Sequence, residues 1–177
     1  MEDRKLVVVG VDGSEDGLRA VKYGASFAAE TNGEVLLVHA VDDAMLAGAW
    51  GVVYDPEVLQ NAGANANEAA AAKAREIGLP GDRIRTEVVL GSPGGVLGRL
   101  SEVADLIVVG RRSVSGLERM FVGSTSVSVV ASSRCPVLVI SAAAHPQDVG
   151  NKKLIGVGLN TSRVNHSTLA AAFEQAQ

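Results

Sequence analysis

The segment Gly110–Thr125 carries the residue types that a phosphate site needs. Its glycines let backbone N–H groups approach a ligand without a Cβ in the way. It ends in Gly-Ser-Thr, where a helix is expected to begin, and the free N–H groups of a helix N-terminus favour anions. Positive charge comes from Arg111, Arg112 and Arg119. Phosphate binding is one interpretation of this segment. The other is an ordinary loop, with glycines for turns and Ser124 as an N-cap.

Two other phosphate signatures are missing from the sequence. Residues 10–17 read Gly-Val-Asp-Gly-Ser-Glu-Asp-Gly, which lacks the Gly-x-Gly-x-x-Gly pattern of dinucleotide-binding turns. Gly-Lys never precedes Ser or Thr, so the sequence contains no P-loop. Glu15 and Asp16 fall in the first turn of an expected helix, where their charge opposes phosphate. A phosphate bound by this chain is therefore expected at Gly110–Thr125.

Apolar runs alternate with helical patterns through most of the chain, which predicts an α/β fold. The expected strands are residues 5–11, 34–41, 83–89, 106–109 and 136–140. The expected helices are residues 14–28, 56–77, 92–103 and 124–132, and residues 42–55 are expected to form a mobile loop. Right-handed crossovers would make a parallel sheet with helices on both faces. Ligands bind such sheets outside the carboxyl ends of the strands, here at Gly10–Ser14, His39–Asp43, Gly91–Gly94 and Gly110–Thr125.

Composition narrows the class of protein. Hydrophobic residues make up 47% of the 177 residues and aromatic residues only 3%, so the core must consist of Val, Leu, Ile and Ala. The net charge of −4 argues against nucleic acid as a main partner. Cys135 is the single cysteine, so no internal disulfide can form, which fits a reducing compartment. The apolar run at residues 6–9 is too short for a signal segment or a membrane span, and the expected location is the cytoplasm.

No catalytic or metal-binding arrangement stands out, so no enzyme is predicted. His39, His145 and His166 have no metal-ligand spacing. Cys135 precedes a proline at a strand start and is typical of a buried small hydrophobic residue. No Ser-His-Asp or paired-carboxylate arrangement can be argued from the sequence.

The tail contains one internal repeat. Residues 153–162 align without gaps with residues 5–14, sharing Lys, Leu, Val, Gly and Ser in step, and an Ala-rich stretch follows. Chance similarity between two apolar strands is one explanation. The other is that residues 1–144 form one domain and residues 145–177 are a linker plus the strand and helix that begin a second copy.

Several segments together resemble the universal stress protein family. They are Val9–Ser14, Leu37–Ala40, Leu106–Gly110, Met120–Ser124 and Cys135–Ile140. The resemblance covers residues 5–140 with every element in order. It implies a three-layer α/β/α sandwich of the Rossmann-like, adenine nucleotide alpha hydrolase-like kind, with strand order 3-2-1-4-5.

The ATP-binding branch of that family carries Gly-x-x-Gly, nine residues, then Gly-Ser or Gly-Thr. This sequence matches the motif at Gly110, Gly123 and Ser124, but Ser113 stands where the second glycine belongs. A serine there adds a Cβ and disfavours positive φ, although its hydroxyl could donate to a phosphate oxygen. The departure bears directly on nucleotide binding.

The resemblance also implies a role for each site residue. Asp12 would accept hydrogen bonds from the ribose hydroxyls, and it also suits an Asx turn. The backbone of Ala40 would meet the adenine edge, and Val11 and Val109 would pack near the base or sugar. Any Mg²⁺ would be held mainly by the phosphates. The full set of implied nucleotide-binding residues is Gly10, Val11, Asp12, Ala40, Val109, Gly110, Arg111, Ser113, Gly123, Ser124 and Thr125.

Two functions remain open at this point. The first is a stress-response regulatory protein that binds ATP or another adenine nucleotide, without catalysis or with slow hydrolysis. The second is a nucleotide-free interaction module that forms a homodimer through the apolar edge Pro136–Ile140 or pairs with a second repeat. A phosphoryl-accepting receiver domain is rejected because Val89-Leu90-Gly91 ends the third strand without an aspartate. An ATP-pyrophosphatase is rejected because the first turn lacks Ser-Gly-Gly-x-Asp-Ser.

Overall fold

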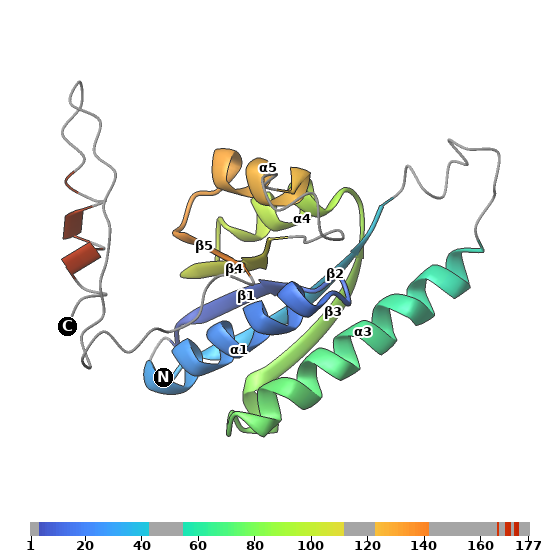
Figure 1. The fold of residues 1–177 in the computed structure, drawn as a ribbon, viewed down its shortest axis with the longest axis horizontal. Helices are drawn as coiled ribbons and strands as arrows, with labels where there is room; N and C mark the ends of the chain where they lie inside the picture. The colour runs from blue at the N-terminus through green and yellow to red at the C-terminus, as the bar shows by residue number, and fades with distance from the viewer. Residues whose placement is uncertain are drawn as a thin grey trace. The chain divides into compact units, whose positions relative to one another are not determined.

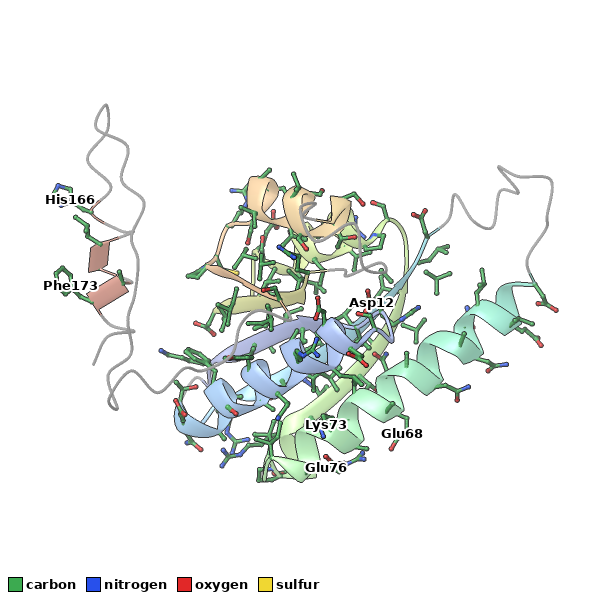
Figure 2. The ribbon with its side chains drawn as sticks, viewed as in Figure 1. Asp12, Glu68, Lys73, Glu76, His166 and Phe173 are labelled. Carbon is green, nitrogen blue, oxygen red and sulfur yellow. The ribbon has the colours of Figure 1, made fainter. Side chains whose placement is uncertain are left out.

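A computed structural model describes residues 4–42, 55–111 and 123–141, and a few residues between 166 and 173. The chain divides into two compact units, Met1–Ala144 and His145–Gln177. The first unit contains the sheet and its helices. The residues described in the second are helical, and among them Phe173 is 69% exposed (Figure 2). The strand expected at residues 153–162 lies outside the described residues, so the repeat stays a prediction.

The first unit is built on a five-stranded parallel sheet. Its strands are β1 (Leu6–Gly10), β2 (Glu34–Val41), β3 (Ile84–Leu90), β4 (Leu106–Gly110) and β5 (Val137–Ile140). Their order, β3-β2-β1-β4-β5, confirms the predicted fold class. The order reverses between β1 and β4, whose Val8 and Ile107 lie side by side.

Helices cover both faces of this sheet. They are α1 (Glu15–Glu30), α3 (Pro56–Glu76), α4 (Pro93–Leu100) and α5 (Ser124–Ser132), with a short 3-10 turn at Gly81–Arg83. Figure 1 shows α1 and α3 on one face and α4 and α5 on the other. Within the described parts of the chain, no helix is long and apolar enough to cross a membrane.

Some boundaries differ from those that the sequence predicts. α4 ends at Leu100 instead of Val103, because Glu102 and Val103 donate to carbonyls only three residues back, at 3.2 Å each. Such bonds tighten the end of a helix. β3 begins at Ile84, after the 3-10 turn, and extends one residue beyond the predicted end, to Leu90. The mobile loop expected at residues 42–55 lies largely outside the described residues.

The core consists of two layers of small apolar side chains. Because side chains alternate along a strand, Val7 and Val9 of β1 pack towards α1 and α3, and Val8 packs towards α4 and α5. All three valines are fully buried. The helices contribute mostly alanine and valine, as the low aromatic content predicts.

The two edges of the sheet differ in chemistry. The outer edge of β3 exposes charge, and its Arg85 pairs with Glu34 at 2.5 Å. The other edge, β5, is made of Val, Leu, Val and Ile, and Leu138 is 39% exposed. Charged residues discourage pairing between edge strands, so β3 is protected in a way that β5 is not.

Candidate functional site

A cavity of about 380 Å³ opens at the carboxyl end of the sheet, between the ends of β1, β2 and β4 and the N-termini of α4 and α5. The cavity lies beside the point where the strand order reverses, between β1 and β4, which is where a ligand site is expected in this fold. Most of the residues predicted to bind a nucleotide line it: Gly10, Val11, Asp12, Ala40, Val109, Gly110, Gly123, Ser124 and Thr125. Strands and helices far apart in the sequence therefore bring the predicted residues together.

Two predicted residues do not contribute to the described wall. Arg111 follows directly on β4, and its N–H donates to the carbonyl of Ile140 at 2.5 Å. Its guanidinium Nε is buried. Ser113, the departure from the glycine motif, lies outside the described residues, so its effect on nucleotide binding stays a prediction.

Asp12 organises the turn between β1 and α1. Its Oδ1 accepts hydrogen bonds from the Ser14 N–H at 3.0 Å and from the Ser14 hydroxyl at 2.6 Å. Gly13 has φ +76°, a value that a glycine adopts without strain. Ser14 in turn accepts from the Gly17 N–H at 3.0 Å and caps α1. The Asx turn is thus present, and Asp12 remains exposed at the carboxyl end of β1 (Figure 2).

Gly110 is required by packing between α1 and β4. A Cβ at this position would lie 2.5 Å from the carbonyl carbon of Asp16 and 2.6 Å from the backbone nitrogen of Gly17. Both are backbone atoms of the first turn of α1, which cannot rotate away. The sequence suggests that this glycine lets a ligand approach the backbone. The structure supplies a reason that holds without any ligand.

The N-terminus of α5 is the end of a helix best suited to an anion. Its N-cap is Gly123, which has no side chain to cap the helix, and the first turn contains no acidic residue. The first backbone hydrogen bond runs from the Val127 N–H to the Gly123 carbonyl at 3.1 Å. The N–H groups of residues 124–126 therefore have no acceptor within the helix, and these residues line the cavity. Free N–H groups and the helix dipole together attract negative charge.

The N-terminus of α1 has the opposite character. Ser14 caps it, and its first turn contains Glu15 and Asp16. Asp16 is only 2% exposed and pairs with Arg19 at 2.5 Å, while Glu15 pairs with the same arginine at 3.3 Å. This helix end is already occupied by its own carboxylates. The expectation that phosphate avoids it therefore has a structural basis.

One buried hydroxyl links the two sides of the candidate phosphate site. Ser126 is 1% exposed, and its hydroxyl donates to the Gly110 carbonyl at 3.2 Å. The bond joins the end of β4 to the first turn of α5. The sequence did not single out Ser126, since only the tertiary structure shows that it faces the strand.

The rest of the cavity wall comes from residues outside the predicted nucleotide-binding set. Leu59 and Ala62 of α3 and Leu97 of α4 make it apolar, and Pro93 borders it at the start of α4. His39 also lines the cavity, and its Nδ1 is buried without a hydrogen-bond partner in the described part of the chain. No sequence motif marks the α3 residues, because their position depends on how α3 packs against β2 and β3.

Side chains for metal binding do not gather in the described part of the chain. There, no group of three His, Cys, Asp or Glu residues is placed to hold a metal ion. Cys135 is half-buried, and its thiol donates weakly to the Pro136 carbonyl at 3.5 Å. The described site therefore combines backbone groups, hydroxyls and apolar surface with the carboxylates of Asp12 and Asp42 and the imidazole of His39. The backbone donors and hydroxyls at the α5 end suit a phosphate, and the apolar surface suits the apolar part of a ligand.

Comparison with known sequences gives consistent matches. A family model described as the universal stress protein family matches residues 4–141. A universal stress protein of Methanocaldococcus jannaschii is 33% identical over 143 residues, covering 77% of this chain and 81% of the relative. One of Mycobacterium tuberculosis is 32% identical over 181 residues, covering 96% of this chain. The present chain spans only 59% of that mycobacterial relative.

Solved structures share the fold. A universal stress protein crystallised in complex with cAMP is 28% identical, with a TM-score of 0.56, covering 77% of this chain and 95% of that one. Universal stress protein UspA from Lactobacillus plantarum is 24% identical, with a TM-score of 0.62, covering 78% of this chain and 99% of that one.

Proposed function

We propose a function for this chain that follows from its family: the chain belongs to the universal stress protein family. The chain is proposed to be a stress-response regulatory protein that binds an adenine nucleotide, ATP first among them, in the cavity at the carboxyl end of the sheet. The observation that carries the proposal is the N-terminus of α5, which has no side-chain cap and whose first residues, Ser124–Ser126, line that cavity.

The rest of the cavity suits the remaining parts of a nucleotide. The carboxylate of Asp12 lies at the cavity wall and is a suitable acceptor for ribose hydroxyls. Ala40, Val109 and Leu97 offer an apolar wall for a base. A relative of the same family has been crystallised with cAMP, which supports an adenine nucleotide as the ligand class. Mg²⁺ would enter with the nucleotide, bound mainly to its phosphates.

The proposed function is binding and not catalysis. Phosphoryl transfer to water needs a side chain that orients the attacking water and cations that stabilise the transition state. The cavity residues that α5 itself contributes, Ser124, Thr125 and Ser126, carry hydroxyls and no general base, and the ionisable side chains of the described wall come from the ends of β1 and β2 instead: Asp12, His39 and Asp42. Any ATP hydrolysis is therefore expected to be slow. The nucleotide would act by favouring one conformer of a docking surface.

Assembly is a second part of the proposal. The apolar edge of β5 would pair with a second copy of the chain or with a second repeat. The aligned mycobacterial relative is longer than this chain, which is consistent with residues 145–177 beginning another copy of the domain. The proposed location is the cytoplasm.

Mass spectrometry of nucleotide released from the purified protein tests the proposed ligand. ATP, ADP or a cyclic nucleotide near one per chain supports it, and so does saturable rebinding after the nucleotide has been stripped. A protein that neither retains nor rebinds nucleotide would point to the interaction module instead. Ser113→Gly separates the two functions further. Binding gained only in this variant would mean that serine has closed the site.

A further inference from the structure

Ser126 connects the two elements that border the candidate phosphate site. Its hydroxyl donates to the Gly110 carbonyl at 3.2 Å, and its side chain is 1% exposed. Gly110 is the last residue of β4, and Ser126 lies in the first turn of α5. Residues 112–122 separate these two elements in the sequence, and the hydrogen bond connects β4 directly to α5.

The end of β4 is itself fixed in place. The first turn of α1 packs so closely on Gly110 that no Cβ fits. On the other side, the backbone N–H of Arg111 donates to the Ile140 carbonyl of β5 at 2.5 Å. Contacts on two sides therefore restrain the Gly110 carbonyl. A group that hydrogen-bonds to this carbonyl is restrained as well.

The N-terminus of α5 has no side-chain cap. Its N-cap, Gly123, makes no side-chain hydrogen bond. By contrast, α1 is capped by Ser14 and α3 by Asp55, each through a side-chain oxygen. Hydrogen-bond donors stabilise an anion most when they are held in position before the ligand arrives. For α5, the described residue that supplies a side-chain tie at this end is Ser126.

We propose that Ser126 is a positioning residue for the phosphate groups of the nucleotide. Its hydroxyl holds the first turn of α5 against the end of β4, so that residues 124–126, which line the cavity, keep their backbone N–H groups in a fixed position. This inference rests on the proposed nucleotide binding. It adds that the affinity for phosphate depends on a hydroxyl that need not touch the ligand.

Ser101 provides a matched control. It is 2% exposed, and its hydroxyl donates to the Gly98 carbonyl at 2.6 Å and accepts from the Arg134 N–H at 2.9 Å. It is thus another buried serine whose hydroxyl donates to a glycine carbonyl, but it does not line the cavity. Either substitution removes the hydroxyl of a buried serine and its hydrogen bond to a glycine carbonyl, so Ser126→Ala and Ser101→Ala are both expected to lower thermal stability.

The test is the dissociation constant for ATP and for adenosine, measured by calorimetry in the wild type and both variants, below the melting temperature of each. Ser126→Ala keeps the backbone N–H groups of residues 124–126 but loses the hydrogen bond that aligns them. The variant is therefore expected to bind ATP about tenfold more weakly. Its effect on adenosine is expected to be smaller, and Ser101→Ala is expected to leave ATP affinity unchanged.

Three results would overturn the inference while leaving the proposed function intact: unchanged ATP affinity in Ser126→Ala, an equal loss in Ser101→Ala, or an equal loss for adenosine. The second would assign the effect to general destabilisation and the third to the base or sugar. A wild-type protein that binds no nucleotide would overturn the proposed function, and the inference with it.

Discussion

Alanine at position 110 is expected to destabilise the protein even when no ligand is present. The added Cβ would lie 2.5–2.7 Å from three atoms, the carbonyl carbon and oxygen of Asp16 and the backbone nitrogen of Gly17. Overpacking a close-packed site costs about 1–3 kcal/mol, and the upper end applies because backbone atoms cannot rotate away. For a domain of this size, about 3 kcal/mol corresponds to a fall in melting temperature of roughly 6–12 °C.

Thermal unfolding of nucleotide-free protein, followed by circular dichroism, measures this effect. Gly81→Ala is the matched control, because nothing lies within 4 Å of its would-be Cβ and its φ is not positive. Its free energy of unfolding is expected to change by no more than about 0.5 kcal/mol. If Gly110→Ala melted like the wild type and lost only nucleotide binding, the packing explanation would be refuted. The glycine would then serve the ligand.

Three further predictions concern packing and assembly. Gly94→Ala should cost about 1–3 kcal/mol, since its Cβ would meet the side chain of Ser128, and Ser128→Gly should recover part of that loss in denaturant unfolding. Asn67→Ala should lower the free energy of unfolding by about 1–3 kcal/mol, because the buried Asn67 amide donates to the Glu87 carbonyl at 2.8 Å; an unchanged denaturation midpoint would contradict this. Leu138→Lys places a charge on the β5 edge and should yield monomers in analytical ultracentrifugation if the wild type forms β5-paired dimers; a dimer that persists would place the contact elsewhere.

The fold could be predicted closely because its signals are local. Buried parallel strands appear as short runs such as Leu106–Gly110, and helix starts are marked by Ser14 and Pro56. Their alternation restricts the topology to a right-handed, doubly wound sheet. Errors are confined to element ends, as at α4, where bonds to carbonyls three residues back shorten the helix.

The site was predictable only in part, because some of its features depend on tertiary packing. Asp12 and Ser124 are adjacent to recognisable turns, so the sequence identifies them. Leu59 comes from α3, and no local pattern shows that it reaches the cavity. The sequence suggests a ligand role for Gly110 and gives no reason to single out Ser126. Their structural roles depend on contacts between elements that are distant in the sequence.

Calorimetric titration of the stripped wild-type protein with Mg-ATP tests the central claim most directly. Saturable binding of one nucleotide per chain is expected, and protein whose cavity already holds nucleotide should give no binding heat. No measurable binding at millimolar Mg-ATP would contradict it, and the cavity between β1, β4 and α5 would then need another occupant.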